Sequence, residues 1–475
     1  MRWIALVLLA ACGGDTPVGG DGGNGGGDGS SSGDAAPPTC APPATFADGL
    51  TPTRVLHVAA NAAPGGDGSS GAPFQNIEQA AAAATPGTAI RLGPGTHEAD
   101  QFVSALHGTA DAPIWIGGEP GQAKPVISGG ATAIQLQRAN FVVIHDLEVS
   151  GATANGINLD DGGMFDDETA AQYLAVERVF VHDIGTGGNN DCLKVSGLNH
   201  LWVYDSHFED CGAGGSGVDH VGCHHTVIAD NVFDGAMSTA VQAKGGSTDI
   251  DIRGNRIAIE GQRAFNLGGS TDLTLFRPSL STSAPNAEAR RIRAFSNFII
   301  TTNTSGTPFA FVGCVDCVAA HNLARGQQRW HLRILQETAT QDGYTFEPSS
   351  NGRVINNSFV FTAASLSTAV NIGADTAPET FTFSNNLWVA SDDPSASAPT
   401  LPVAETGGVV GGATGYGDAL DAWDPHAALP DFICRDAAER NAGAPLPELT
   451  GNARGECFED PRPIGPLNSG SCTLL

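Results

Sequence analysis

Six segments of this chain share one pattern, in which a short apolar run is followed by asparagine and further apolar residues. They are VIADNVF (227–233), IDIRGNRI (250–257), RAFSNFI (293–299), VAAHNLA (318–324), RVINNSF (353–359) and TFSNNLW (382–388). An amide at a turn tolerates a left-handed backbone and can hydrogen-bond its own copy one coil away. The pattern therefore predicts a ladder of stacked asparagines made of Asn231, Asn255, Asn297, Asn322, Asn357 and Asn386.

A second recurring segment lies between these copies, with a small residue first and then an apolar–polar–apolar alternation. Its copies are AIQL (133–136), GINL (156–159), CLKV (192–195), GVDH (217–220), AVQA (240–243), AFNL (264–267) and AVNI (369–372). Two short strands in each unit of about 20 to 25 residues are typical of a solenoid. We therefore predict an all-β chain that folds as a parallel β-helix. An antiparallel sandwich is the alternative, but it does not explain why asparagine recurs at one register.

Composition supports many short strands and limits the partners. The chain has 62 Gly, 3 Met and only 16% charged residues, which does not favour long helices. With 23 basic and 51 acidic residues its net charge is −28, so it should repel nucleic acid and anionic membranes. The charge favours divalent cations and opposes a polyanionic ligand unless basic residues gather locally.

The N-terminus has the features of a secretion signal. Arg2 is followed by the apolar run Trp3 to Leu9 and then by Leu9-Ala10-Ala11-Cys12, which resembles the bacterial lipobox. We expect residues 1–11 to be a signal peptide and Cys12 to be the lipidated first residue of the mature chain. An ordinary signal peptide ending near a cysteine is the alternative. We expect an extracytoplasmic monomer, held at a bacterial membrane only by its lipid.

The rest of the chain divides into three parts. Residues 12–50 are rich in Gly, Asp, Ser and Pro and are expected to form a flexible tether. Residues 51–391 are predicted to form the β-helix, with a short capping helix between Asn76 and Pro86. Residues 392–475 are predicted to be an irregular C-terminal wrap that covers the last coil, because an open end would expose an unpaired sheet edge.

Nine cysteines remain after Cys12, in what should be an oxidising compartment. Disulfides are expected, with one thiol left over. Cys434 could pair with Cys457 or with Cys472, and the sequence does not decide which. Cys314 and Cys317 have the spacing of a redox motif, but without a βαβ context a structural bridge or a stacked thiol is the better interpretation.

The N-terminal part of the body resembles a known class of proteins. HVAANAAPGGDGSSGAPFQNIEQAAAAATPGTAIRLGPGTH (57–97) and GTADAPIWIGGEPGQAKPVISGG (108–130) are similar to the entry of secreted bacterial right-handed β-helix proteins, among them the chondroitinase-B and alginate lyase family and the pectate lyases. The resemblance covers about residues 53–390. It implies a right-handed β-helix and a carbohydrate ligand, but the same superfamily also contains glycosidases, epimerases and non-catalytic proteins.

Stacking the second type of segment predicts a functional face. One outward column should contain Gln135, Asn158, Lys194, Asp219, Gln242 and Asn266, and the next should contain Asp160, Ser196 and Lys244. Adjacent coils lie about 4.8 Å apart, so Lys194, Asp219 and Gln242 should be direct neighbours. Arg263 follows Lys244 by 19 residues, which is close to one coil. A surface ion-pair ladder without function is the alternative interpretation of these charges.

In the lyase family that the chain resembles, a lysine and an arginine about one coil apart act beside a calcium ion. Lys244 and Arg263 match that spacing, so we expect catalytic roles for Lys244, Arg263 and Lys194, and substrate contacts from Asp219, Gln242, His220 and Asn190. The family's calcium-binding glutamates are replaced here by Met237 and Thr239. If calcium binds, its ligands would have to come from Asp219, Asp191 and Asp160.

These observations favour a lipoprotein that binds an acidic polysaccharide and cleaves it by β-elimination. A base must remove the proton at C5 while cationic groups neutralise the uronate carboxylate. The second hypothesis is an inverting glycosidase that uses Asp160, Asp191 and Asp219. The third is a non-catalytic surface or adhesion protein whose solenoid face binds glycan or protein.

Overall fold

The computed structural model describes residues 40–185, 187–412, 414, 424–426 and 441–468. The signal peptide, Cys12, the tether up to residue 39, Cys434 and Cys472 lie outside these residues. Among the described residues, no helix is long and apolar enough to span a membrane.

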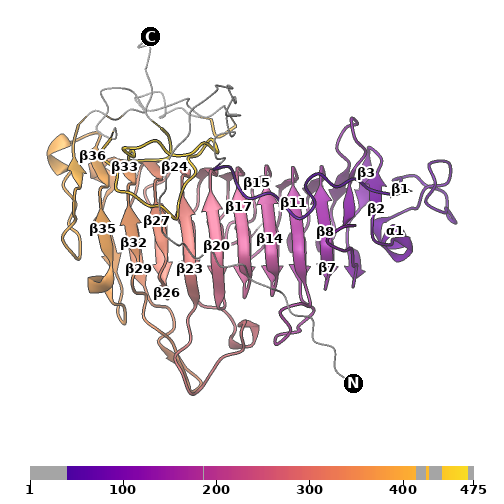
Figure 1. The fold of residues 1–475 in the computed structure, drawn as a ribbon, viewed down its shortest axis with the longest axis horizontal. Coiled ribbons are helices and arrows are strands. Elements are labelled where there is room, and N and C mark those ends of the chain that lie inside the picture. Colours follow the sequence, from indigo (N-terminus) through magenta and orange to yellow (C-terminus); the bar gives the residue numbers. More distant parts are fainter. Residues whose placement is uncertain (1–39, 186, 413, 415–423, 427–440, 469–475) are drawn as a thin grey trace, which may run out of the picture. The chain divides into compact units, whose positions relative to one another are not determined.

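Three parallel sheets form the body, and successive strands of the chain visit them in turn. Sheet A has 13 strands and faces the viewer in Figure 1. Its strands are β1 (Arg54–Val58), β2 (Thr88–Leu92), β5 (Ile114–Gly118), β8 (Asn140–His145), β11 (Gln172–Glu177), β14 (Asn199–Tyr204), β17 (His224–Ala229), β20 (Ser247–Arg253), β23 (Ala289–Phe295), β26 (Cys314–Val315), β27 (Val318–Ala320), β32 (Arg353–Ile355) and β35 (Thr382–Ser384).

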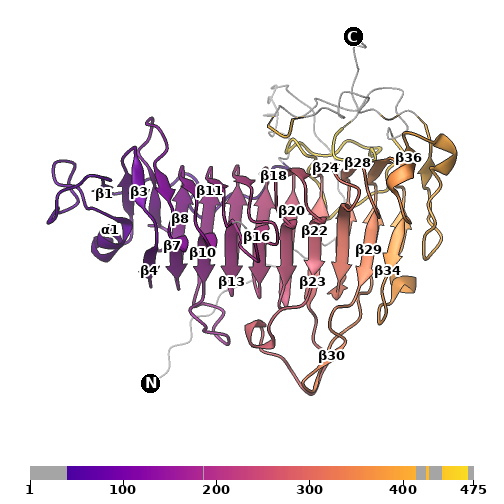
Figure 2. The ribbon, with the colours of Figure 1, turned by 180° about the vertical axis from the view of Figure 1, so that it is seen from behind.

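Sheet B has 10 strands and is seen from the opposite side, in Figure 2. Its strands are β4 (Gln101–Ser104), β7 (Thr132–Gln137), β10 (Asn155–Asp160), β13 (Leu193–Ser196), β16 (Ser216–Val221), β19 (Thr239–Lys244), β22 (Arg263–Gly268), β25 (Thr307–Val312), β29 (Leu332–Leu335) and β34 (Val370–Ile372).

Sheet C has 12 strands. Its strands are β3 (Thr96–Glu98), β6 (Val126–Ser128), β9 (Glu148–Ser150), β12 (Phe180–His182), β15 (His207–Glu209), β18 (Val232–Gly235), β21 (Arg256–Ile259), β24 (Phe298–Thr301), β28 (Leu323–Gly326), β33 (Ser358–Phe361), β36 (Leu387–Ala390) and β37 (Val409–Val410). Six of them, from β18 to β36, begin directly after one of the predicted ladder asparagines. The remaining short elements are α1 (Ile77–Ala83), the hairpin of β30 (Thr340–Gln341) with β31 (Tyr344–Thr345), and the 3-10 turns η1 (Leu273–Leu275), η2 (Ala363–Ser365), η3 (Pro378–Thr380) and η4 (Pro394–Ala396).

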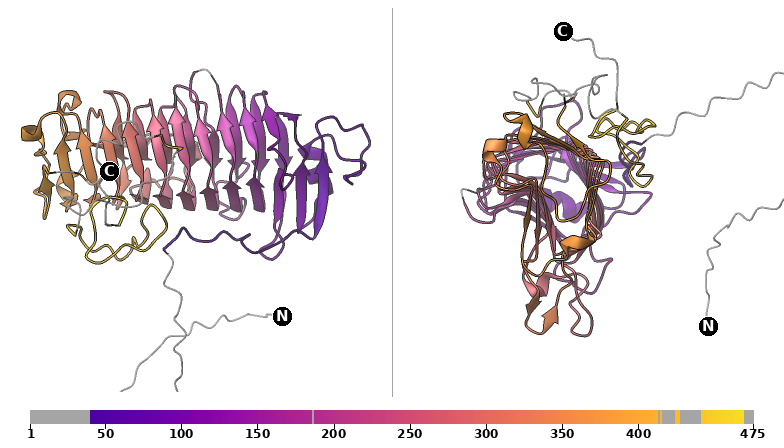
Figure 3. Two further views of the ribbon diagram at one scale, coloured as in Figure 1. Left: turned by 90° about the horizontal axis from the view of Figure 1, so that it is seen from above. Right: turned by 90° about the vertical axis from the view of Figure 1, so that its left-hand side faces the viewer.

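Every strand pair of the three sheets is parallel, which confirms the predicted β-helix and excludes the antiparallel sandwich. The end-on view in Figure 3 shows the coils superimposed on one another. Inward residues of all three sheets bury one continuous apolar core, with large rings such as Phe265, Phe309 and Trp388 in the later coils. Helix α1 begins after Asn76, as predicted, because the Asn76 side chain accepts a hydrogen bond from the Gln79 N–H. Its residues Ile77 and Ala80 join this core at the N-terminal end.

The predicted asparagine ladder is present. Each side-chain amide donates to the carboxamide oxygen of the next copy, from Asn231 to Asn255 (3.0 Å) and onward to Asn386. Glu405 ends the ladder, because its carboxylate accepts from the Asn386 side chain at 2.8 Å. The left-handed backbone conformation was predicted for the ladder asparagines themselves, and this prediction was wrong by one residue. The residue before each ladder asparagine has the positive φ, as at Asp230 (60°) and His321 (54°).

Three long connections leave the C-terminal ends of sheet B strands. They are residues 161–171, 269–288 and 336–352, and Figure 2 shows them projecting from one edge of the coils. They lie beside the outward side chains of sheet B, where the predicted site is located.

The predicted roles of the two terminal segments need correction. Residues 40–50 are not a free tether, because Phe46 and Ala47 pack on sheet A beside Trp115 and the Tyr204 hydroxyl donates to the Pro43 carbonyl at 2.8 Å. The C-terminal part was predicted to cover the last coil as a whole, but its two described segments, 391–412 and 441–468, pack against different parts of the body. Residues 441–468 pack against strands of sheet A through Leu446 and Leu449, whereas residues 391–412 cover the last coil.

A disulfide between Cys40 and Cys457 joins the two terminal segments. It excludes the predicted pairing of Cys434 with Cys457. Cys192 pairs with Cys211, and Cys314 with Cys317, so the structural bridge predicted at the latter pair is present. Of the described cysteines, Cys223 is the free thiol, and it is buried.

Candidate functional site

The predicted polar column is in register on sheet B. Backbone pairing aligns Gln135, Asn158, Lys194, Asp219, Gln242 and Asn266 on successive strands, and it continues through Ala310 and Arg333 to Asn371. The second column is also in register, from Asp160 through Ser196 and Val221 to Lys244. Their strand neighbours, such as Val195 and Ala243, are buried in the core, so the columns face outward.

Lys194 and Asp219 form an ion pair at the centre of the column. The Lys194 Nζ also lies 3.5 Å from Asp191, and the Lys244 Nζ lies 3.4 Å from Asp219. Burial opposes the charged form of Asp219, but the two lysines outweigh it and hold the pKa of this carboxyl below its usual range. Burial likewise opposes charge on Lys194, but Asp219 and Asp191 raise the pKa of its amine. Lys194 is therefore a charged, structural cation at neutral pH.

Asp191 differs from Asp219 in its protonation. Burial, and then the nearby Asp219 carboxylate, raise the pKa of Asp191 to about 6. Its Oδ1 accepts the Ser216 N–H at 2.8 Å, which fixes the side chain at the start of β16. The site thus contains one carboxyl that stays ionised and a neighbour that can take up a proton just below neutrality.

Arg263 reaches this cluster by an unexpected route. It pairs with Thr239, at the opposite end of β19 from Lys244, so the predicted placement of Arg263 beside Lys244 was wrong. Its guanidinium extends along β22 and donates to the Asn266 Oδ1 at 2.7 Å. Hydrogen bonds of 3.2 Å from Asn266 to Gln242 and 3.4 Å from Gln242 to Asp219 then connect it to the lysines.

His220 does not belong to the outer face. It follows Asp219 directly on β16, so it points into the coil, where it is fully buried between Val195 and Ala243 in register. Burial lowers its pKa to about 4, and neither ring nitrogen has a hydrogen-bond partner among the described residues. The predicted contact of His220 with substrate was therefore wrong. Asn190 lies before β13, where its side chain donates to the Thr153 carbonyl at 2.5 Å.

The three aspartates named as calcium ligands do not fit one ion. Asp160 accepts hydrogen bonds from Gln135 at 2.8 Å and from Asn158 at 3.2 Å, one column away from the other two. Between Asp191 and Asp219 the Lys194 ammonium already occupies the position of a cation. Calcium needs six to eight oxygen ligands, and this arrangement does not supply them, so we derive no reaction step through calcium.

Part of the outer face of sheet B was not predicted from the sequence. Arg333 continues the column, and its guanidinium lies 4.6 Å from the ring centre of Trp330. Arg329 lies 4.3 Å from the same ring. Glu337 approaches Arg263 to 3.7 Å. The signal was available in HLRI (331–334), which matches the recurring segment except that His331 replaces the small first residue.

We call this set the basic face. It consists of the outward side chains Lys194, Lys244, Arg263 and Arg333 on sheet B, together with the neighbouring Arg329 and Trp330.

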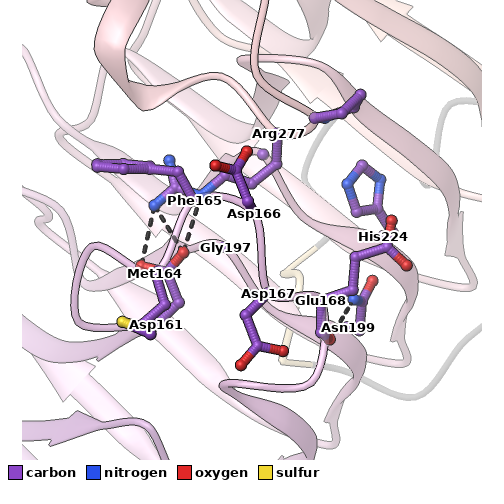
Figure 4. Close-up of a pocket in the computed structure, with 12 residues that line it drawn as sticks. Asp161, Met164, Phe165, Asp166, Asp167, Glu168, Gly197, Asn199, His224 and Arg277 are labelled. Atoms are coloured by element: carbon purple, nitrogen blue, oxygen red, sulfur yellow. Dashed lines mark hydrogen bonds and ion pairs between the residues drawn. The ribbon is translucent and has the colours of Figure 1, made fainter.

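A separate pocket of about 140 Å³ lies between the connections 161–171 and 269–288 (Figure 4). The Arg277 guanidinium binds both oxygens of Asp161, at 2.8 and 2.9 Å, and packs 3.9 Å from the Phe165 ring centre. Acidic side chains, Asp166, Asp167 and Glu168, surround the opening. The buried ion pair holds the two loops together, and the acidic rim makes this pocket unsuited to an anionic ligand.

No family model and no curated protein matches this sequence. Among solved structures, the pectate lyase Pel9A matches with a TM-score of 0.51 and 14% identity, over 89% of this chain and 98% of the lyase. A lacto-N-biosidase from Eubacterium ramulus matches with a TM-score of 0.49 and 12% identity, over 71% and 67% of the two chains. An alginate lyase from Paenibacillus sp. str. FPU-7 matches with a TM-score of 0.43 and 14% identity, over 69% and 99%. The chain is a right-handed parallel β-helix with the architecture of a pectate lyase.

Proposed function

We propose that the protein binds an acidic polysaccharide along the basic face and cleaves it there by β-elimination. The observation that supports this most is the gathering of cations on one side of a strongly acidic chain. The net charge is −28 and the chain has only three lysines, yet Lys194 and Lys244 both lie on this face with Arg263 and Arg333. Local positive charge of this kind overcomes the repulsion that the whole protein exerts on a polyanion.

The side chains suit a chain of uronate sugars. Guanidinium groups pair with carboxylates through two parallel hydrogen bonds, and Arg263 and Arg333 supply two such groups on nearby strands. Trp330 offers an apolar ring that can pack on the face of a sugar. The parallel strands repeat at about 4.8 Å, so these contacts are spread along an extended ligand.

Elimination assigns separate roles to the cations. Arg263 pairs with the uronate carboxylate, which acidifies the proton at C5. Lys244 acts from its neutral amine form: it takes that proton and becomes the ammonium, the electron pair forms the C4–C5 double bond, and the bond from C4 to the leaving oxygen breaks. The leaving oxygen receives a proton from the Lys244 ammonium. Lys194 takes no part in proton transfer, because its raised pKa keeps it charged and paired with Asp219.

The hydrolytic alternative has weaker support. Asp219 is fully buried and paired with lysine, and Asp191 is only 1% exposed, so neither can reach a glycosidic bond as the side chains now lie. Inverting hydrolysis needs two carboxyls that face the same bond.

The experiment is to incubate the purified protein with pectate, alginate and chondroitin sulfate and to follow ultraviolet absorbance and reducing ends together. Elimination predicts both signals, and Lys244→Met should abolish them. Lys124→Met is the matched control, since Lys124 donates to the Arg178 carbonyl in another part of the coil.

Each other outcome contradicts a part of the proposal. Reducing ends without ultraviolet absorbance would replace elimination by hydrolysis. Binding without either product would leave a non-catalytic glycan-binding protein. Failure to bind any of the three polymers would contradict the proposal as a whole.

We also propose that Cys12 carries a lipid that anchors the protein outside the cytoplasm. The supporting observation is the sequence Leu9-Ala10-Ala11-Cys12 after a short apolar run. Labelling of expressing cells with a tagged fatty acid should mark the wild-type chain and not Cys12→Ala. Equal labelling of both chains, or of neither, would contradict lipidation at this residue.

A further inference from the structure

A group of metal-binding side chains lies on the outer face of sheet C, away from the basic face. His207 is on β15 and Asp234 is on β18, the neighbouring strand. Their strand neighbours Phe208 and Phe233 are fully buried, so alternation turns the histidine and the aspartate outward. Backbone register places Asp234 beside Glu209, and His207, two residues before Glu209 on β15, reaches Asp234 diagonally across the two strands.

The third member, His426, comes from a distant part of the chain. Its Nε2 lies 2.9 Å from Asp234 Oδ2, while the Nε2 of His207 lies 2.7 Å from Asp234 Oδ1. Each oxygen of one carboxylate thus faces a different imidazole. The donor atoms all lie within 4.8 Å of one another, and this is the one such group of three or more found among the described residues.

The imidazoles are held in place by neighbouring rings. The His207 ring stacks on Phe180 with 4.5 Å between ring centres and an angle of 9°. The His426 ring meets the His207 ring edge to face, with centres 4.6 Å apart. Such contacts limit ring rotation and keep both Nε2 atoms directed at the same point. The arrangement is therefore already organised before any ligand arrives.

We propose that His207, Asp234 and His426 bind a divalent transition-metal ion, with Zn²⁺ as the ion they fit best. Zinc takes imidazole nitrogen and carboxylate oxygen at about 2.0 to 2.2 Å, with tetrahedral geometry. Donor atoms in such a site lie roughly 3.3 Å apart, so a small outward shift of the two imidazoles is enough. Calcium and magnesium prefer oxygen ligands and are disfavoured by the two nitrogens.

Binding replaces the two hydrogen bonds by metal–ligand bonds. On binding, the Nε2 proton that each imidazole donated to Asp234 passes to solvent, the neutral imidazole carries its remaining proton on Nδ1 and presents the Nε2 lone pair to the ion, and the carboxylate stays ionised. Three protein ligands leave one position for water. Because His426 is 192 residues from Asp234, the ion would fasten the segment 424–426 to sheet C.

The test is calorimetric titration of the purified full chain with Zn²⁺ after removal of metals by a chelator. One equivalent should bind. His426→Ala, which changes a half-exposed side chain, and Asp234→Asn should each weaken binding on the order of 100-fold, since even an indirect partner of a ligand contributes 10 to 100-fold.

His57→Ala is the matched control, because His57 on sheet A pairs with one carboxylate, that of Glu119, at 2.7 Å and without a second histidine. It should bind zinc as the wild type does. Co²⁺ in place of Zn²⁺ should give a visible absorption band that His426→Ala loses. Absence of zinc binding by the wild type, or equal binding by His426→Ala, would show a hydrogen-bonded cluster only and overturn the proposal.

Discussion

Lys194 on β13 and Asp219 on β16 are partners in register, and the lysine ammonium forms an ion pair with a carboxylate that has no exposed surface. A fully buried charge on an outward position is unusual, because outward positions of a sheet normally meet solvent. Here the second lysine, Lys244, and the amide of Gln242 complete the shell around Asp219. The pair is therefore part of the framework on which the rest of the basic face is built.

Replacing Lys194 by Met should destabilise the protein. The variant leaves Asp219 buried with Lys244 as its remaining cation, and loss of one partner of a buried pair costs about 3 kcal/mol. Urea unfolding measures the change. The double variant Lys194→Met with Asp219→Leu removes both charges and should recover most of the loss. A single variant as stable as the wild type would contradict the structural role of the pair.

Glu288 should make stability depend on pH. Burial raises the pKa of this carboxyl from 4.5 to about 7. Between these values the unfolded chain is ionised while the folded chain keeps the proton, so the free energy of unfolding falls as pH rises from about 4.5 to about 7. In the wild type this fall amounts to about 3 kcal/mol. The Glu288→Gln variant cannot ionise at this position, so its free energy of unfolding should not show this fall. Parallel stability curves for the two proteins across that pH range would refute the assignment.

Substitution of an asparagine in the middle of the ladder should lower the stability of the protein strongly. Asn297→Ala removes the acceptor of the Asn255 N–H and of the Asn255 side chain, and also the donor to Asn322. Several buried groups lose their partners, each at about 1 to 3 kcal/mol, so we expect a fall of several kcal/mol in unfolding experiments. Asn61→Ala, at an exposed turn, is the control and should change stability little. Equal effects of the two substitutions would contradict the ladder's role.

The disulfide between Cys40 and Cys457 should hold both terminal segments on the coil. Replacing both cysteines by Ala should expose residues 40–50 and 441–468 to protease while the sheets resist digestion, and should lower stability by about 2 to 5 kcal/mol. Mass spectrometry of the fragments identifies the cleaved segments. Cys223→Ala removes a free thiol and no crosslink, so its digestion pattern should match the wild type. An unchanged pattern for the double variant would show that packing alone holds the segments.

Repetition made the coils and the central column predictable from the sequence. Lys194, Asp219 and Gln242 could be aligned because their segments share one alternation and parallel pairing preserves it. His220 was misplaced although the same rule applies to it, since a residue next to Asp219 must point inward. Arg263 was misplaced because coil length varies. Its partner is Thr239, 24 residues earlier, and the assumed step from Lys244 was 19.

Contacts without a local signal could not be predicted. The bond between Cys40 and Cys457 spans 417 residues, and no pattern in the sequence specifies such a pairing. His426 meets Asp234 for the same reason, through tertiary packing alone. The positive φ before each ladder asparagine is a further case. Turn propensity predicted the positive φ for the asparagine. In the structure the asparagine side chain is held in the ladder by hydrogen bonds, and the preceding residue has the positive φ.

The measurement that tests the central claim most directly is the affinity for an acidic polysaccharide of two double variants with equal net charge. Arg263→Ala with Arg333→Ala alters the basic face, whereas Arg178→Ala with Arg291→Ala removes two arginines that pair with Asp146 and Asp249 elsewhere. Each charged contact is worth about 1.5 kcal/mol or more, so the first double variant should bind roughly 100-fold more weakly. The second should bind nearly as the wild type does. Equal losses in the two variants would contradict a binding site on the basic face.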